Sequence, residues 1–218
     1  MRTTGEKILD LIYPPSLYCI CCGNIIDETR HYNLCDHCIS HIQWNGDDSR
    51  NIDGMRTDWC VYYGPYERTL IFSLKYNGKK YIARDIAAIM ADKLEYMEKE
   101  FDCIVPVPIS AERKKERGFN QMELVGKHLS EITGKPCFGD CLFRTRKTMP
   151  MRGPGPEERK ANIRGAIALN GKYDTILRNR TVLLIDDFYT TGSTASECRE
   201  ILEKAGPHEV AFLAFAAQ

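Results

Sequence analysis

The sequence has no surplus of charge: 30 lysines and arginines stand against 30 aspartates and glutamates in 218 residues. Net charge therefore favours no class of partner, and any affinity for nucleic acid or phosphate must come from local clusters. The sequence also lacks an apolar run as long as a signal peptide or a membrane-spanning helix. We therefore expect a cytoplasmic protein with no segment inserted in a membrane. A chain of this length buries one sizeable core and leaves room for a small appendage.

Cysteine, in contrast, is abundant, and five of the ten cysteines lie within residues 19–38. Two Cys-x2-Cys pairs stand twelve residues apart in this segment, and their members are Cys19, Cys22, Cys35 and Cys38. Each short gap lets one turn present two thiolates to one ion, and two such turns complete a tetrahedral zinc site. The spacing predicts structural Zn²⁺, because four protein ligands leave no open position for catalysis.

The remaining cysteines do not repeat this spacing. Cys21 is the spare thiol of the segment, and His31 or His37 is an alternative fourth ligand. Because no export signal is present, we expect the scattered cysteines to be buried thiols rather than disulfides. These are Cys60, Cys103, Cys137, Cys141 and Cys198.

Helical and strand patterns alternate through the rest of the chain. Residues 44–54 are polar and turn-rich, as in a linker or hairpin. Helical spacing predicts helices over 82–94, from about 120 to a stop at Gly134, and over 194–206. The last of these begins at Thr194, with Glu197 positioned for a capping box. Apolar runs predict strands over 101–109, 137–143, 181–187 and 209–217. The run over 181–187 does not alternate with polar residues, which is typical of a strand covered on both faces. This order predicts an α/β domain with a largely parallel sheet.

The strand over 181–187 ends in Asp186 and Asp187, followed by a loop of small residues, Thr190, Thr191, Gly192, Ser193 and Thr194. Ligands of open α/β sheets bind beyond the carboxyl ends of the strands, and a helix N-terminus favours an anion. The segment predicts a site for a phosphate next to vicinal hydroxyls or a metal-bound group, as in a ribose 5-phosphate. It lacks the Gly-Lys-Ser/Thr of a P-loop. The alternative is a well-capped helix after a buried strand.

These residues carry a resemblance to a known family. "LLIDDFYTTGST" resembles the phosphoribosyl-pyrophosphate (PRPP) motif of type I phosphoribosyltransferases. The cysteine pairs, "LKYNGK", "VPVPIS" followed by "RGFNQ", and "ERKANIRGA" narrow this to the competence-associated ComF family. The resemblance implies a type I phosphoribosyltransferase fold, with a mostly parallel sheet flanked by helices. Residues 1–50 would form a small zinc-binding domain of four cysteine ligands with its linker, and residues 51–218 the phosphoribosyltransferase-like domain.

The resemblance also implies roles for single residues. Asp186 and Asp187 would bind the ribose hydroxyls and steady the positive charge at C1. Thr190 to Thr194 would hold the 5′-phosphate, and Lys75 would approach the pyrophosphate. The "VPVPIS" turn and the "RGFNQ" match would complete the PRPP site with Pro106, Val107, Pro108, Arg117, Asn120 and Gln121. Mg²⁺ would arrive on the pyrophosphate oxygens.

Residues 144–164 are basic and rich in proline and glycine, with seven lysines or arginines against two glutamates. We interpret this segment as a flexible lid over PRPP, with Arg159 and Asn162 as the family-matched contacts. The alternative is a disordered basic loop. Met151 stands where the family usually has a glutamine, which leaves the acceptor and the activity open.

Two functions are compatible with the sequence. The chain is either a phosphoribosyltransferase with an unidentified acceptor, or a module that binds single-stranded DNA during uptake, together with competence-machinery proteins. In the second hypothesis the PRPP site is regulatory or vestigial. The neutral charge weighs against DNA binding, and Tyr62, Tyr63 and Tyr66, the nearest candidates for stacking on bases, are better interpreted as core residues.

Overall fold

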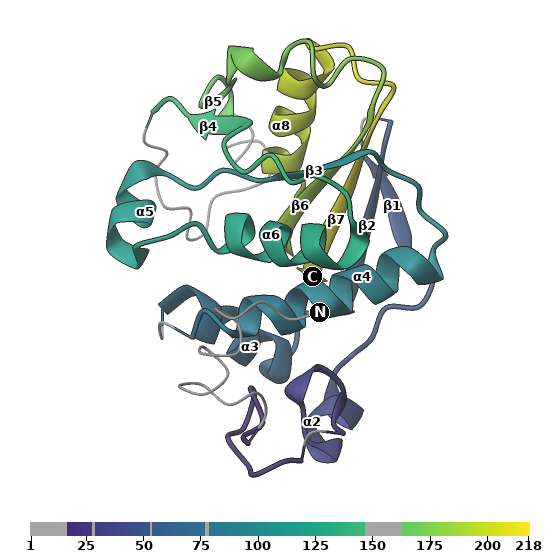
Figure 1. Ribbon diagram of the computed structural model, residues 1–218, viewed down its shortest axis with the longest axis vertical. Helices are drawn as coiled ribbons and strands as arrows, with labels where there is room; N and C mark the ends of the chain where they lie inside the picture. Colours follow the sequence, from purple (N-terminus) through teal and green to yellow (C-terminus); the bar gives the residue numbers. More distant parts are fainter. Residues whose placement is uncertain (1–16, 28, 53, 77–78, 147–162) are drawn as a thin grey trace.

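The computed structural model describes residues 17–27, 29–52, 54–76, 79–146 and 163–218. Within them, the main sheet has the strand order β1-β2-β7-β6-β3. The strands are β1 (Ser49–Ile52), β2 (Met55–Tyr62), β3 (Cys103–Pro106), β6 (Thr181–Tyr189) and β7 (Glu209–Ala217). β1 forms an antiparallel hairpin with β2, and the other four strands are parallel. The parallel strands therefore end at one common edge (Figure 1).

The sheet is covered on both faces, as the uninterrupted apolar runs predict. In β7, Ala211, Leu213 and Phe215 pack with one set of helices, and Val210, Phe212 and Ala214 pack on the opposite side. Successive side chains of a strand point to opposite faces, so a strand buried on both sides needs apolar residues throughout. The predicted fold class, a mostly parallel sheet flanked by helices, is confirmed.

Three long helices cover the first face: α3 (Pro65–Tyr76), α4 (Ile82–Tyr96) and α6 (Gln121–Thr133). The second face carries α8 (Ser193–Glu203) and an antiparallel pair of short strands, β4 (Leu142–Arg144) and β5 (Ile167–Leu169). The smaller helices are η1 (His31–Asn33), α2 (Asp36–His41), α5 (Ala111–Arg117) and η2 (Gly171–Tyr173). Figure 1 shows α6 and α4 on one side of the sheet and α8 on the other.

Helix α6 begins and ends where the sequence predicts. The Asn120 side chain accepts a hydrogen bond from the Met122 N–H at 2.9 Å, and Gly134 ends the helix in the left-handed region with φ 71°. Gly126 allows the close approach of α6 to the sheet, because an added Cβ would lie 2.7 Å from the Cys137 Sγ.

The predicted capping box of the last helix is wrong. Helix α8 begins at Ser193, its N-cap is Gly192, and no side chain caps it. Glu197 instead accepts a hydrogen bond from the Gly165 N–H at 2.6 Å, which ties α8 to the segment before β5. A long-range contact thus replaces the local one that the spacing favours.

The N-terminal cysteine segment packs on the main domain. Its apolar residues, among them Ile20, Leu34 and Ile42, belong to the same buried cluster as α4. The Asn33 amide donates to Asp85 on α4 at 2.7 Å, and the Tyr32 hydroxyl donates to Asp92 on the same helix. Figure 1 shows this unit at one end of the molecule, next to α3.

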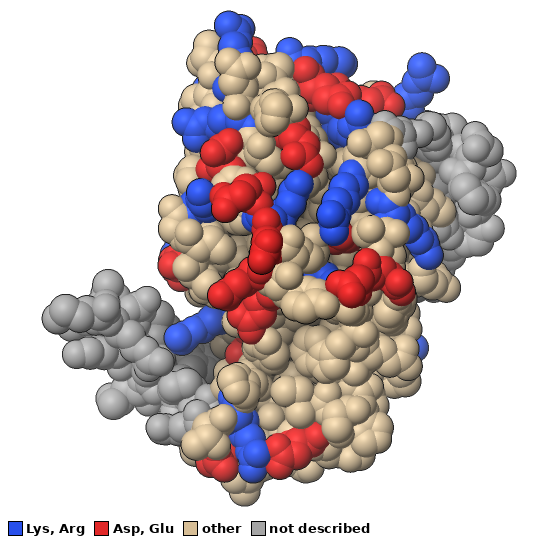
Figure 2. All heavy atoms as spheres, turned by 90° about the vertical axis from the view of Figure 1, so that its right-hand side faces the viewer, with Lys and Arg blue, Asp and Glu red and all other residues tan. Residues whose placement is uncertain are grey.

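The surface agrees with the balanced composition. On the face drawn in Figure 2, lysines and arginines are interspersed with aspartates and glutamates, and neither sign forms a broad continuous field. Among the described residues, no helix is both long and apolar enough to cross a membrane.

Candidate functional site

The carboxyl ends of β3 and β6 bring two sequence motifs together. Pro106 pairs with Ile185 in the parallel ladder, and the Val107 N–H donates to the Ile185 carbonyl at 2.9 Å. The Asn120 amide donates to the Val107 carbonyl at 3.3 Å. The loop after β3 is therefore fixed directly beside Asp186 and Asp187.

Asp187 lies at the centre of this edge. Only 7% of Asp187 is exposed, and two side chains donate hydrogen bonds to its carboxylate. Lys75 from α3 donates to Oδ1 at 2.7 Å, and Gln121 from α6 donates to Oδ2 at 2.6 Å. A buried carboxylate needs such partners because the loss of its hydration is otherwise costly.

Asp186 lies in a different electrostatic environment. It is next to Asp187 on the strand, so its side chain points toward the opposite face. Lys75 and, to a smaller extent, Arg144 of β4 favour its ionised form. Its Oδ1 accepts the Asp187 N–H at 2.8 Å.

The two carboxyl groups therefore have opposite pKa shifts. Burial and the negative charge of Asp187 raise the pKa of Asp186 to about 7, against the smaller effects of its hydrogen bond, Lys75 and Arg144. Burial also opposes ionisation of Asp187, but Lys75, Gln121 and Arg117 outweigh it and lower the pKa of Asp187. Two adjacent groups that titrate apart are typical of functional sites.

A chain of hydrogen bonds extends outward from Asp187. Gln121 accepts from Arg117 Nη1 at 2.9 Å, and Arg117 Nη2 donates to the Tyr76 hydroxyl at 3.1 Å. The Arg117 guanidinium also lies 4.9 Å from the centre of the Tyr76 ring. Arg117 thus connects the buried carboxylate to an exposed aromatic ring.

The loop after β6 carries several hydroxyl groups and leads into the N-terminus of α8. Gly192 has φ 74°, and an added Cβ would lie 2.8 Å from Ile52 Cδ1 and 3.1 Å from the Tyr189 ring, so only glycine fits. The Thr191 and Ser193 hydroxyls lie 3.0 Å apart. Helix α8 begins at Ser193, and its first N–H groups have no partner within the helix.

The structure thus brings Lys75, Arg117, Gln121 and Asp187 into one network, with Asp186, Asn120 and residues 106–108 beside it. The loop 190–194 follows on the same strand end. Arg159, Asn162 and Met151 lie outside the described residues.

Sequence reasoning missed three residues at this edge. Phe72 and Tyr76 are each 52% exposed on α3, with ring centres 4.9 Å apart. Arg144 donates from Nε to the Pro108 carbonyl at 2.9 Å. Residues four apart lie on the same face of a helix, so the spacing of Phe72 and Tyr76 could have indicated that the two rings are neighbours. The sequence around Arg144 contains no pattern that places this residue near the strand ends.

The tyrosines considered for stacking have other contacts. Tyr62 packs edge-on against Trp59, and the Tyr66 hydroxyl lies 3.1 Å from His37 Nε2. Tyr63 is 41% exposed and packs against Phe188, with ring centres 4.5 Å apart.

The four predicted cysteine ligands form one cluster. The thiols of Cys19, Cys22, Cys35 and Cys38 all lie within 4.8 Å of one another, which suits a single tetrahedral ion. Gly23, with φ 79°, makes the turn after the first pair, where its N–H donates to the Cys19 carbonyl at 2.9 Å.

The alternative ligands lie elsewhere. Neither His31 nor His37 belongs to the cluster found among the described residues. Cys21 directs its thiol toward the Tyr66 carbonyl, 3.8 Å away, and burial raises its pKa to about 11. The scattered cysteines are free, and burial raises the pKa of Cys103 to about 11 and of Cys137 and Cys141 to about 12. The prediction of buried thiols is confirmed for Cys60, Cys103, Cys141 and Cys198, while Cys137 is half-buried.

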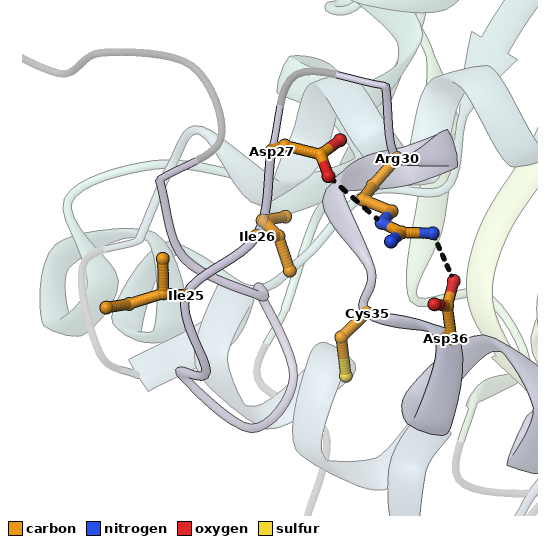
Figure 3. Close-up of a pocket in the computed structure, with 6 residues that line it drawn as sticks. All are labelled: Ile25, Ile26, Asp27, Arg30, Cys35 and Asp36. Atoms are coloured by element: carbon orange, nitrogen blue, oxygen red, sulfur yellow. Dashed lines mark hydrogen bonds and ion pairs between the residues drawn. The ribbon is translucent and has the colours of Figure 1, made fainter.

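A hollow of about 390 Å³ lies beside Cys35 (Figure 3). Its lining residues are Ile25, Ile26, Asp27, Arg30, Cys35 and Asp36. Arg30 lies between two carboxylates there, 3.7 Å from Asp27 and 2.5 Å from Asp36, so its charge is compensated within the hollow. None of the strand-end residues lines it.

No family model matches the chain. Competence protein F of Haemophilus influenzae is 28% identical over 203 residues, which cover 87% of this chain and 86% of that protein. The chain is a homologue of competence protein F. The resemblance to the ComF family is thereby confirmed.

Two further relatives also have names that refer to competence or to the use of DNA. DNA utilization protein YhgH of Escherichia coli is 28% identical over 66% of this chain and 64% of its own length. Competence protein ComFC of Streptococcus pneumoniae is 29% identical over 62% of this chain and 56% of its own length.

Solved phosphoribosyltransferases are more distant. The glutamine PRPP amidotransferase of B. subtilis has a TM-score of 0.43 at 18% identity, covering 66% of this chain and 30% of that one. The adenine phosphoribosyltransferase of Leishmania tarentolae has a TM-score of 0.43 at 13% identity, covering 88% and 90%. The fold is therefore assigned from the strand order and strand directions of the sheet, and not from these neighbours.

The cysteine cluster generates the first prediction. Purified protein should contain one Zn²⁺ per chain, measured by elemental analysis, because four convergent thiols bind this ion tightly. Cys35→Ser should lose the metal and melt at a lower temperature, since Cys35 also accepts the Cys38 N–H at the start of α2. Cys21→Ser is the matched control and should keep the metal. Zinc retained by Cys35→Ser but lost from Cys21→Ser would overturn the ligand assignment.

Proposed function

We propose that this chain binds PRPP at the carboxyl edge of its sheet and transfers the phosphoribosyl group to an acceptor. The observation that carries the proposal is the buried Asp187 carboxylate, oriented by Lys75 and Gln121 beside the hydroxyl loop. The division into a zinc-binding unit over 1–50 and a phosphoribosyltransferase-like domain over 51–218 is part of the proposal, although its boundary falls within β1.

Asp186 and Asp187 would accept hydrogen bonds from the ribose 2′- and 3′-hydroxyls, since ionised carboxylates are strong acceptors. The loop 190–194 and the N-terminus of α8 would hold the 5′-phosphate. In the transfer, the C1–O bond breaks and its electron pair leaves with the pyrophosphate, while a lone pair of the acceptor forms the new bond to C1. The two carboxylates would stabilise the positive charge that develops on the sugar.

Lys75 would serve the leaving group. Its ammonium already lies at the site, and ribose hydroxyls that bind Asp187 would compete with it for that carboxylate. A released Lys75 would then move its charge toward the pyrophosphate. Residues 106–108, fixed by Asn120, would supply backbone groups to the same anion.

Mg²⁺ fits this site as a companion of the ligand, because it keeps several waters and is commonly held through substrate phosphates and one or two carboxylates. Asp187 and, above pH 7, Asp186 would be the ionised carboxylates available to it. Bound with pyrophosphate, the ion would neutralise part of the leaving group's charge. Arg159 and Asn162 remain proposed lid contacts.

The names of the relatives support a link to DNA uptake or use, which we extend to this chain together with a cytoplasmic location. That link favours a transferase working alongside competence-machinery proteins.

Binding of PRPP should stabilise the fold. With Mg²⁺ and PRPP at about a hundred times its dissociation constant, the gain should be about 2.7 kcal/mol. For a chain of this length, that corresponds to a melting-temperature rise of about 5–10 °C, measurable by calorimetry.

Asp187→Asn should abolish most of that rise, because an amide replaces the charged acceptor. The unliganded variant should also melt at a lower temperature, because Lys75 loses its ion-pair partner. We expect its free energy of unfolding to fall by about 1–3 kcal/mol. Each variant is therefore compared with its own unliganded form. Asp102→Asn is the matched control: Asp102 accepts from the Thr181 N–H at the opposite end of β6, and its variant should keep the full rise. A wild-type protein that shows no shift would contradict the proposal.

Affinity for PRPP should depend on pH through Asp186. The raised pKa, about 7, means that the carboxyl is protonated in acid, when it is a poorer acceptor for hydroxyl groups. Affinity should therefore rise with pH, by up to about tenfold per unit below 7, and level off above it. Titration calorimetry from pH 5.5 to 8.5 measures this.

Asp186→Asn provides the control, because the ligand's own phosphate also titrates in this range. The variant should bind more weakly and keep only the pH dependence that belongs to the ligand. Identical pH profiles for the variant and the wild type would exclude Asp186 from the site.

A second candidate function, binding of single-stranded DNA, is favoured by the exposed cluster on α3. Phe72 and Tyr76 lie side by side with Arg117 against the second ring, and Arg68 is exposed one turn before Phe72. Close by in sequence, the Lys80 ammonium lies 5.0 Å from the Phe119 ring centre. Aromatic rings interleaved with cations are typical of surfaces that stack unpaired bases.

Phe72→Ala should therefore weaken binding of a single-stranded oligonucleotide by about 5- to 100-fold, measured by fluorescence anisotropy at low salt. The affinity of the wild type should fall as salt rises. Tyr96→Ala is the matched control, because Tyr96 is 62% exposed on another helix. Equal loss in both variants, or none in Phe72→Ala, would count against the stacking surface.

A further inference from the structure

Glu67, in the first turn of α3, is a buried carboxylate that the proposed reaction does not use. None of it is exposed, and it accepts hydrogen bonds from two backbone N–H groups, Gln43 at 2.8 Å and Gly64 at 2.9 Å. Gly64 directly precedes the helix, so its bond to a glutamate three residues later is one half of a capping box. The other bond reaches a segment more than twenty residues away. Glu67 therefore fixes the start of α3 to two separate parts of the chain.

The distant partner, Gln43, lies between the cysteine unit and the sheet. The residue before it, Ile42, ends α2, and its N–H donates to the Cys38 carbonyl at 3.1 Å. The Gln43 carbonyl in turn accepts from the N–H of Tyr62, the last residue of β2, at 2.7 Å. Glu67 thus joins the cysteine unit, the end of β2 and the start of α3 at one point.

The other end of α3 carries Lys75 to the candidate site. Glu67 and Lys75 are eight residues apart, which is about 12 Å along a helix. The sheet order places β7 between β2 and β6, so the ends of β2 and β6 are about 10 Å apart. Helix α3 therefore reaches from the end of one strand to the end of the other, where Lys75 donates to Asp187 at 2.7 Å. A helix transmits displacements as a stiff element, so a shift at Glu67 also moves Lys75.

We propose that Glu67 is a positioning residue, which holds Lys75 against Asp187 by fixing the start of α3. Through Gln43, the same contact relays the position of the cysteine unit to the strand-end site. The consequence for ligand binding rests on the proposed function, because Lys75 is assigned there to the pyrophosphate. The ion pair itself exists without ligand, so the positioning role is tested first on the ligand-free protein.

The titration of Asp187 reports the position of Lys75. Burial raises the pKa of Asp187, and Lys75 has the largest effect in the opposite direction. Carboxyl ¹³C NMR on the full chain follows this titration, with Asp187→Asn to assign the signal. Glu67→Gln turns an amide N–H toward a backbone N–H, so it should break one of the two bonds and shift the Asp187 titration to higher pH. Lys75→Met should shift it in the same direction.

The double variant distinguishes positioning from a general loss of structure. If Glu67 acts through Lys75, adding Glu67→Gln to Lys75→Met should shift the Asp187 titration no further than Lys75→Met alone. A further shift in the double variant, or an unchanged titration in Glu67→Gln, overturns the proposal.

Gly64→Ala provides a second variant that leaves the Glu67 side chain unaltered. An added Cβ would lie 2.8 Å from Glu67 Oε2, and the φ of Gly64 is not in the left-handed region. The substitution should therefore displace the carboxylate and shift the Asp187 titration as Glu67→Gln does. If Glu67→Gln does not fold, Gly64→Ala decides by the same measurement.

Glu197→Gln is the matched control, because Glu197 is also a buried glutamate on a helix that accepts a backbone N–H, that of Gly165. It should lower the melting temperature and leave the Asp187 titration unchanged. A shift equal to that of Glu67→Gln would mean that any loss of packing moves Lys75, and would overturn the positioning role.

Binding of the two halves of PRPP then connects Glu67 to the proposed function. In titration calorimetry with Mg²⁺, Glu67→Gln should weaken inorganic pyrophosphate by about 5- to 50-fold and change ribose 5-phosphate by less than about twofold. An unchanged pyrophosphate affinity beside a shifted titration overturns the role of Lys75 at the leaving group and not the role of Glu67. A wild type that binds neither ligand overturns the proposed function, while the Asp187 titration still decides the inference.

Discussion

The ion pair between Lys75 and Asp187 connects the parts of this molecule that sequence places far apart. A carboxylate at the end of a buried strand would be costly without compensation, and here α3 supplies a cation while α6 supplies an amide. Because each partner comes from a different helix, the geometry of the edge depends on the packing of both helices on the sheet. The same interaction keeps Asp187 ionised and ready to accept hydrogen bonds.

Helix α3 extends this dependence to the cysteine unit. Near its start, the Tyr66 carbonyl and hydroxyl contact Cys21 and His37, and the fully buried Glu67 accepts from the Gln43 and Gly64 N–H groups. Near its end, it presents Lys75 to Asp187. One helix thus contacts the proposed zinc unit at one end and the proposed sugar site at the other. We infer from these contacts that the cysteine unit helps to hold α3 in place, and Lys75 with it.

The sequence predicts the parts of the structure that depend on local pattern. The apolar runs of β6 and β7, the ends of α6 at Asn120 and Gly134, and the cysteine spacing each carry their signal within a few residues. The parts that it misses depend on distant contacts. Glu197 accepts from the Gly165 N–H and does not form the predicted capping box. Arg144 contacts the Pro108 carbonyl because β4 lies beside the loop after β3. The sequence pattern also does not predict α3. The resemblance implies that Lys75 and Asp187 lie near a common ligand. It does not predict the ion pair between them, which only the structure shows.

The central claim is that the carboxylates at the end of β6 hold the sugar of a phosphoribosyl ligand. A crystal structure with ribose 5-phosphate tests it most directly. We expect the ribose 2′- and 3′-hydroxyls within hydrogen-bond distance, about 2.5–3.0 Å, of Asp186 and Asp187, and the phosphate on the N–H groups of residues 190–194. We also expect the Lys75–Asp187 contact to open or lengthen. Ligand bound elsewhere, with that ion pair intact, would contradict the account.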